Sequence, residues 1–234
     1  MGRSVVLAGA ARCPCCQLQP RWCICDAIPP VDTAVRVHVF IHRHEHGKPS
    51  STGRLVARVV NGASASIYQR QSRFFPAAAF PTESLAADRE LWILHPTGAP
   101  LPAAATETTT AARGRPQILL LDATWRQAGE MLRSVEGLGR CVRLPESTAE
   151  PSRFWLRHQA EPTHVSTAEA VMGVFRGLGE TAAAERLRLH FELHVYAMLL
   201  ARGRRELAAR YLGGSPLSDA LPGFLAEFHA RRAD

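Results

Sequence analysis

Hydrophobic residues along the chain fall into short runs that alternate with amphipathic segments, a pattern typical of α/β proteins. Aliphatic runs predict strands at residues 34–41, 91–95 and 117–122. From Ile118 to Leu121 every residue is apolar, so both faces of that strand are expected to be buried, as in a parallel sheet. Helical spacing of apolar positions predicts helices at residues 53–60, 124–135, 181–202, 206–212 and 221–232. We therefore expect an α/β fold with a mostly parallel sheet flanked by helices.

Composition narrows the class of protein. With 46% hydrophobic and 21% charged residues, the chain differs from disordered and coiled-coil proteins. It has no apolar run of the roughly 20 residues that cross a membrane, and residues 1–11 are too short for a secretion signal, so we expect a cytoplasmic protein without a membrane partner.

The net charge of +7 favours a polyanionic partner. A basic surface that contacts only solvent is the alternative, because every basic residue except Lys48 is arginine, a bias that genome composition can produce. Nothing in the sequence indicates an oligomeric state.

Cysteines are clustered near the N-terminus, where five of the six fall between residues 13 and 25. In a reducing compartment such a cluster favours a metal over disulfides. Four of the thiols have the spacing C-x2-C-x6-C-x-C and are predicted to bind a tetrahedral zinc ion: Cys13, Cys16, Cys23 and Cys25. Because all four positions would be protein ligands, the zinc would be structural and residues 1–30 would form a zinc knuckle, separate from a catalytic domain at 31–234. Cys15 would not bind it. A loop of reduced thiols is the alternative.

The most informative segment follows the buried strand and reads Asp122-Ala123-Thr124-Trp125. An acidic residue at the carboxyl end of a parallel strand lies where open α/β sheets bind ligands. Asp122 could instead cap the helix that begins near Thr124, which is a common role for aspartate. Trp125 favours a binding role, because an aromatic ring beside a carboxylate can stack on a base or on a sulfonium-bearing ligand.

The D-x-T-W segment resembles the signature of the DTW-domain family, the tRNA-uridine aminocarboxypropyltransferases, and three further segments agree in order and spacing. The cysteine cluster is similar to the family's N-terminal zinc motif. Residues 41–55 resemble its H-x-x-E and N-T-G-R-L segments, with Ser51 where asparagine is usual. Residues 164–170 resemble its L-S-T-x-E-A segment, with Val165 in place of leucine. The resemblance covers about residues 12–200.

This resemblance implies a SPOUT-like α/β fold with a deep trefoil knot that binds S-adenosylmethionine. It implies transfer of the 3-amino-3-carboxypropyl group from that donor to N3 of a tRNA uridine, which leaves methylthioadenosine. Because one fold can support several reactions, two alternatives stay open. The first is an RNA methyltransferase of similar fold, and the second is a zinc-knuckle RNA-binding protein without catalytic activity.

The reaction assigns roles to the matching residues. N3 of uridine is a weak acid, so Asp122 is the candidate general base, with Thr124 and Trp125 beside it in the catalytic set. Ser166, Thr167 and the helix that they open could hold the donor's carboxylate, or Ser166 and Glu169 could form only a helix cap. The residues expected to contact the donor are Ser166, Thr167 and Glu169, together with the apolar residues Leu94, Pro96 and Leu121. The expected RNA contacts are Lys48, Arg54, Arg153 and Arg157, for which a solvent-exposed or structural role is the alternative.

Two groups of histidines could suggest further metal sites. His42, His44 and His46 surround Glu45, but the sulfonium of the donor already activates the leaving group, so we expect no metal there. His190 and His194 lie one helical turn apart in the longest predicted helix. Without a third ligand in the sequence, we expect them to be structural histidines with hydrogen-bonded rings.

Overall fold

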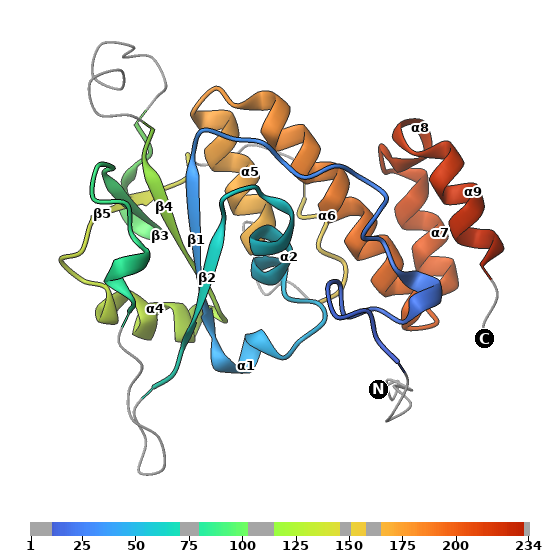
Figure 1. Ribbon diagram of the computed structural model, residues 1–234, viewed down its shortest axis with the longest axis horizontal. Coiled ribbons are helices and arrows are strands. Elements are labelled where there is room, and N and C mark those ends of the chain that lie inside the picture. The colour runs from blue at the N-terminus through green and yellow to red at the C-terminus, as the bar shows by residue number, and fades with distance from the viewer. Residues whose placement is uncertain (1–10, 71–79, 103–114, 146–150, 158–164, 232–234) are drawn as a thin grey trace.

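The computed structural model describes residues 11–70, 80–102, 115–145, 151–157 and 165–231, and its centre is a five-stranded parallel sheet (Figure 1). The strand order is β2-β1-β4-β3-β5. The strands are β1 (Arg36–His42), β2 (Ser64–Tyr68), β3 (Leu91–Pro100), β4 (Gln117–Asp122) and β5 (Arg140–Arg143). The parallel sheet expected from the sequence is therefore confirmed, and β4 has the predicted bounds.

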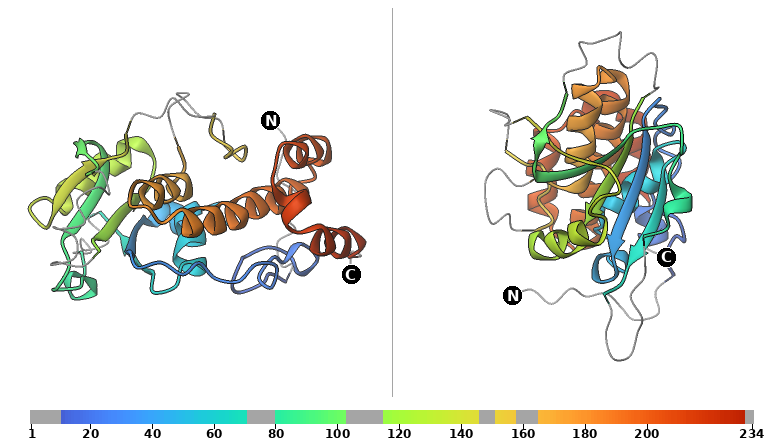
Figure 2. Two further views of the ribbon diagram at one scale, coloured as in Figure 1. Left: turned by 90° about the horizontal axis from the view of Figure 1, so that it is seen from above. Right: turned by 90° about the vertical axis from the view of Figure 1, so that its left-hand side faces the viewer.

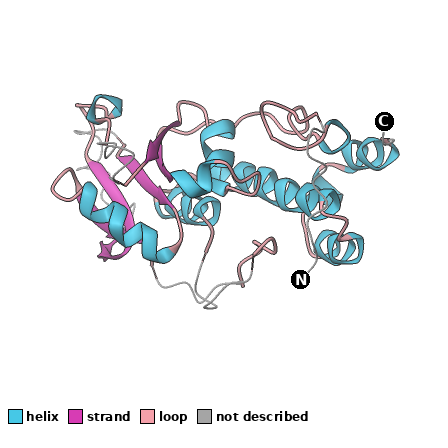
Figure 3. Cartoon of the chain, turned by 90° about the horizontal axis from the view of Figure 1, so that it is seen from below, coloured by secondary structure: helices cyan, strands magenta, loops and turns pink. Residues whose placement is uncertain are grey.

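Helices cover both faces of this sheet (Figures 1 and 3). Those longer than one turn are α2 (Thr52–Val59), α4 (Trp125–Ser134), α5 (Thr167–Gly177), α6 (Thr181–Ala201), α7 (Arg205–Gly213) and α9 (Pro222–Ala230). The short ones are η1 (Pro20–Trp22), α1 (Arg43–His46), η2 (Thr82–Ser84) and α8 (Leu217–Ala220). In the described ranges, no helix has both the length and the apolar character to cross a membrane.

Successive side chains of a strand point to opposite faces of the sheet and pack in two separate hydrophobic cores. Val39 of β1 and Leu120 of β4 pack in the larger core, together with α2, α5 and α6. Phe40 and Leu119, the neighbours of those two residues, face the other way and pack with Met131 of α4. The central strands are apolar on both faces for this reason, which is why the sequence pattern identified them.

The N-terminal segment, from residue 11 to β1, lies along α6 and reaches the C-terminal helices, as Figure 1 and the left view of Figure 2 show. Cys16, Leu18 and Ile24 of this segment belong to the larger core. The ring of Trp22 lies 5.4 Å from that of Phe228 in α9, and the Arg231 guanidinium donates a hydrogen bond of 2.6 Å to the Cys23 carbonyl. The cysteine-rich segment therefore shares its core with the helices, while the division at residue 30 stays a prediction.

The knot stays a prediction as well. Between β5 and α5 the chain includes residues 146–150 and 158–164, which lie outside the described residues.

Candidate active site and cysteine cluster

The candidate active site lies between β1 and β4, two neighbouring strands whose following chain connections run to opposite edges of the sheet. From β1 the chain passes through α2 to β2 at one edge, and from β4 it passes through α4 to β5 at the other edge. Since α2 and α4 cover opposite faces, the adjacent carboxyl ends of β1 and β4 form a topological switch point, the usual ligand site of an open α/β sheet. Asp122 is the last residue of β4 and lies at this point.

Asp122 is buried, with 6% of its surface exposed, and both of its carboxylate oxygens accept hydrogen bonds. The Ser51 hydroxyl donates to Oδ2 at 2.8 Å, and the Thr167 hydroxyl donates to Oδ1 at 2.6 Å. Ser51 is the N-cap of α2 and Thr167 is the first residue of α5, so the positive ends of two helices meet at this carboxylate. Burial raises the pKa of Asp122 above its ordinary value, although both hydroxyls oppose the shift. Asp122 is therefore a more basic carboxylate than an exposed one.

Gly53 allows the backbone of α2 to approach the Asp122 side chain closely. A Cβ atom at position 53 would lie 2.5 Å from Cγ and 2.6 Å from Oδ2 of Asp122. Because the Asp122 side chain is fixed by two hydrogen bonds, it has no room to move away. The glycine of the 51–55 segment is thus required by the contact between α2 and the end of β4.

We expect Gly53→Ala to destabilise the protein by about 1–3 kcal/mol, because the added methyl group overlaps a fixed, buried side chain. Gly129→Ala in α4 is the matched control, since a Cβ there meets nothing within 4 Å. That change should be neutral or stabilise the helix by up to about 1 kcal/mol. Thermal denaturation of the two variants measures the difference. Equal stabilities would contradict the role assigned to Gly53.

Asp122 does not cap α4. The N-cap residue is Thr124, whose backbone N–H and hydroxyl both donate to Oε1 of Gln127, at 3.1 and 2.7 Å. The alternative reading of Asp122 as a helix cap is therefore wrong, and its carboxylate instead joins two other helices to the sheet. Trp125 begins α4 and is 46% exposed.

The beginning of α5 forms a helix cap, which the sequence left open beside a role in donor binding. The Glu169 backbone N–H donates to the Ser166 hydroxyl at 3.3 Å, and the Glu169 carboxylate accepts from the Ser166 backbone N–H at 2.7 Å. Glu169 also accepts hydrogen bonds from the Ser152 hydroxyl and the Arg153 backbone N–H. These side chains are engaged within the protein, so the groups that α5 can offer a ligand are backbone N–H groups of its first turn, which have no intrahelical partner.

The three apolar residues expected to contact the donor come from two neighbouring strands, β3 and β4. Leu94 and Pro96 belong to β3, and Leu121 belongs to β4. Leu94 and Leu121 are half-buried, whereas Pro96 is exposed. Leu121 is next to the carboxyl end of β4, Leu94 is the last residue of β3 that pairs with β4, and Pro96 lies in the irregular stretch of β3 between Leu94 and Ala99.

Glu45 gives the H-x-x-E segment a structural role. This carboxylate is 2% exposed and accepts hydrogen bonds from Lys48 at 2.5 Å and from Arg157 at 2.7 Å. Burial acts to raise its pKa, but these two cations hold the pKa below its ordinary value. Glu45 therefore fixes two of the four predicted RNA-binding cations beside each other.

The other two predicted RNA-binding cations lie in different surroundings. The Arg54 guanidinium donates a long hydrogen bond of 3.3 Å to the His46 carbonyl and forms no ion pair with a carboxylate of the described residues. Arg153 makes a bidentate ion pair with the buried Glu192, at 2.9 and 2.8 Å, and its guanidinium lies over the ring of Tyr211. Its charge is already paired inside the helical part of the molecule, a geometry that favours the structural alternative for Arg153. Sequence reasoning missed this pair because Glu192 lies 39 residues away in α6.

The cysteine cluster has the geometry of a metal site. The four predicted sulfur atoms lie within 4.8 Å of one another. The Cys13–Cys25 and Cys16–Cys23 Sγ distances are 3.6 and 3.8 Å, close to the separation of about 3.8 Å expected for sulfurs placed tetrahedrally around zinc. Cys15 is exposed and lies outside the cluster. Burial raises the pKa of Cys16 and Cys25, and a bound cation would favour their thiolate forms. These four cysteines could hold a metal ion.

The two histidines of α6 differ from each other. His190 makes a hydrogen bond of 2.9 Å to the Pro29 carbonyl, as expected for a structural histidine. His194 is buried, and neither ring nitrogen has a hydrogen-bond partner among the described residues. The expectation of a hydrogen-bonded ring is therefore confirmed for His190 and wrong for His194.

These observations define an α/β protein with a candidate ligand site at the carboxyl ends of its parallel strands and a four-cysteine cluster that could hold a metal ion. Residues 10–199 match the family model of the DTW domain, and the chain belongs to the DTW domain family. Among solved structures, one similar chain is described as the SAM-dependent rRNA:acp-transferase Tsr3 from Vulcanisaeta distributa. The two chains are 17% identical, and the match covers 84% of this chain and 98% of that chain with a TM-score of 0.46.

Proposed function

We propose that this DTW-domain protein is a cytoplasmic tRNA-modifying enzyme that transfers the 3-amino-3-carboxypropyl group of S-adenosylmethionine to N3 of a uridine. The observation that carries this proposal is Asp122, a buried carboxylate at the switch point, in a chain whose residues 10–199 match the DTW domain. The site offers a basic carboxylate and two helix N-termini, which suit the deprotonation of a weak acid beside an anionic group of a donor.

In the proposed mechanism, Asp122 accepts the N3 proton of the uridine. The bond from N3 to the γ-carbon of the donor forms as the bond from that carbon to sulfur breaks, and methylthioadenosine leaves. The raised pKa of Asp122 brings its basicity closer to that of the imide. Ser51 and Thr167 orient the carboxylate and can rotate their hydroxyls when it becomes protonated.

The remaining catalytic and donor contacts stay proposals with distinct roles. Backbone N–H groups at the start of α5 would hold the donor's carboxylate, so that its γ-carbon rather than its methyl group faces the nucleophile. Trp125 would stack on a base or on the donor, and Thr124 caps the helix that Trp125 begins. The half-buried Leu94 and Leu121, with Pro96, would contact the adenosine.

Zinc is the metal that we propose for the cysteine cluster. Four thiolates at tetrahedral spacing leave no open coordination position, which suits a structural ion rather than a catalytic one. A zinc knuckle at residues 1–30 would anchor the cysteine-rich segment against α6 and α9. The SPOUT-like knot belongs to the same proposal and would lie within the catalytic domain at residues 31–234.

The proposed reaction is tested by its products. The protein is incubated with unmodified tRNA and S-adenosylmethionine, and the nucleosides and the spent donor are identified by mass spectrometry. Aminocarboxypropyluridine together with methylthioadenosine supports the proposal. S-adenosylhomocysteine would identify a methyltransferase, and RNA binding without either product would identify a binding protein.

For the RNA, we propose contacts at Lys48, Arg54 and Arg157, with Arg153 the weakest of the four candidates because Glu192 pairs with it. Arg54→Glu is expected to weaken tRNA binding and to reduce its dependence on salt by about one released counterion. Arg210→Glu, an exposed change in α7, is the charge-matched control and should leave that slope unaltered. Titrations at several salt concentrations give the slopes. An unaltered slope for Arg54→Glu would assign Arg54 to the solvent-exposed surface.

A further inference from the structure

The surface beside the candidate active site gathers cations from separate segments of the chain. Glu45 holds two of them together, because its carboxylate accepts hydrogen bonds from Lys48 at 2.5 Å and from Arg157 at 2.7 Å. Burial raises the pKa of Asp122, and the charge of Arg157 acts in the opposite direction, so this guanidinium lies within electrostatic reach of the Asp122 carboxylate. The positive surface therefore begins next to the candidate general base.

The end of α6 continues this positive surface. Arg202 is the C-cap residue of α6, and its guanidinium donates a hydrogen bond of 3.0 Å to the carbonyl of Leu156, the residue before Arg157. Partial burial lowers the pKa of Arg202, and the charges of Arg204 and Arg157 lower it further. Arg202 is thus held close to two other arginines that repel its charge.

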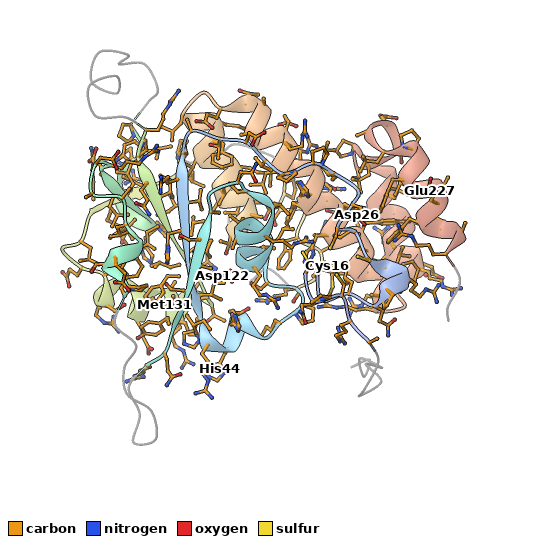
Figure 4. All side chains as sticks on the ribbon, in the orientation of Figure 1. Cys16, Asp26, His44, Asp122, Met131 and Glu227 are labelled. Atoms are coloured by element: carbon orange, nitrogen blue, oxygen red, sulfur yellow. The ribbon has the colours of Figure 1, made fainter. Side chains whose placement is uncertain are left out.

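α2 contributes to the same region of charge. Arg54 belongs to this helix, which lies between the labelled residues Asp122 and Cys16 in Figure 4. Burial lowers the pKa of His194 to about 3, and Arg58, Arg202 and Arg54 act in the same direction. Arginines of α2 and of the end of α6 therefore act on one buried ring, which places their charges in one region.

The start of α7 adds cations where a helix disfavours them. Arg204 is the N-cap residue of α7 and Arg205 is its first residue, at the positive end of the helix dipole. Glu206 is also in the first turn. Nevertheless, Arg202, Arg204 and Arg205 form no ion pair with a carboxylate of the described residues. The fold accumulates positive charge here at some cost in stability, and a polyanion would relieve the repulsion.

We propose that the end of α6 and the start of α7 form an RNA-docking surface, in which Arg202 and Arg204 bind backbone phosphates outside the target nucleotide. This inference rests on the proposed function and extends the RNA contacts from the neighbourhood of Asp122 onto the C-terminal helices. Hydrogen bonds join the two regions, because Arg202 binds the carbonyl of Leu156 and the next residue is Arg157. Each phosphate that such a guanidinium neutralises releases counterions, so the surface would strengthen RNA binding without reading its sequence.

The first test measures tRNA binding without donor at several salt concentrations. The double variant Arg202→Gln/Arg204→Gln should bind about tenfold or more weakly, and the slope of log K against log salt should fall by about two. Arg210→Gln is the matched control, because Arg210 is an exposed arginine of the same helix, and six residues of helix turn it to a different side. Affinity and slope equal to those of the control would overturn the proposal.

Stability separates binding from a structural role of these arginines. Arg204→Gln should melt no lower than wild type, because it removes a cation from the positive end of α7, while it still weakens tRNA binding. A lower melting temperature with unaltered tRNA affinity would overturn the proposal for Arg204. This single variant also keeps the test decisive if loss of the Arg202 hydrogen bond destabilises the double variant.

Steady-state kinetics distinguish this surface from the proposed reaction itself. The double variant should raise the KM for tRNA more than it lowers kcat, because its contacts lie away from the reacting atoms. If wild type forms aminocarboxypropyluridine while the variants bind tRNA like Arg210→Gln, the docking surface fails and the proposed function stands. If wild type binds tRNA with the expected slopes but forms no such product, the proposed reaction fails and the docking surface stands.

Discussion

Replacing Asp122 by asparagine is expected to reduce the rate of aminocarboxypropyl transfer by about 100-fold or more, because the variant lacks the base that accepts the uridine proton. The amide is nearly isosteric with the carboxylate. The Ser51 and Thr167 hydroxyls can each donate or accept, so both contacts at the end of β4 can be retained. Single-turnover transfer with excess enzyme measures the chemical step, and calorimetry measures donor affinity on the same preparation.

Stability distinguishes a catalytic from a structural role for this carboxylate. Burial raises the pKa of folded Asp122, so its contribution to stability is full below the unfolded pKa and is lost as pH rises through the folded pKa. At neutral pH the wild-type protein bears the free-energy cost of burying an ionised carboxylate, and a neutral asparagine does not. Asp122→Asn should therefore melt no lower than wild type. In wild type, transfer should slow as pH falls below the raised pKa, because the base becomes protonated. Near-wild-type transfer by the variant would end the claim, and lost donor affinity would assign Asp122 to donor binding.

The position of Asp122 could be predicted, whereas its partners could not. Four consecutive apolar residues identified β4 as a buried strand, and strand ends in parallel sheets are known ligand sites. The two hydroxyls that bind its carboxylate come from residues 71 and 45 positions away, and no local pattern encodes such contacts. Gly53 was noticed only as part of a family-like segment, while its reason, a 2.5 Å approach to Asp122, is tertiary.

The sequence also could not predict the edge strands of the sheet or the partners of its charged residues. β2 and β5 were not predicted, because an edge strand of this sheet needs no continuous apolar run, and their side chains are mostly exposed or half-buried. Arg153 and Arg54 look alike in sequence, yet Arg153 pairs with a buried glutamate, whereas Arg54 pairs with no acid in the part of the chain that the structure describes. Whether an arginine is available to RNA depends on which acid the fold brings to it, and helix α6 supplies that acid from another part of the chain.

The second large effect is expected at the cysteine cluster, where Cys23→Ser should remove the metal and destabilise the whole chain. Binding to four thiolates contributes about 10–16 kcal/mol of apparent free energy in small zinc modules, and that free energy is coupled to folding. Here the cluster is continuous with the larger core through Cys16, and Trp22 and Arg231 join the cysteine-rich segment to α9. Elemental analysis should find one zinc per wild-type chain and much less in the variant, with a lower melting temperature.

Cys15→Ser is the matched control, since Cys15 is exposed, lies one residue from a proposed ligand and is outside the sulfur cluster. Its zinc content and melting temperature should equal those of wild type, because serine replaces a thiol that makes no contribution to the tetrahedral set. Equal zinc loss in both variants would show that the ligands are misassigned, and full zinc in both would show that Cys23 is not a ligand. A Cys23→Ser protein that loses zinc but melts like wild type would separate metal binding from the shared core.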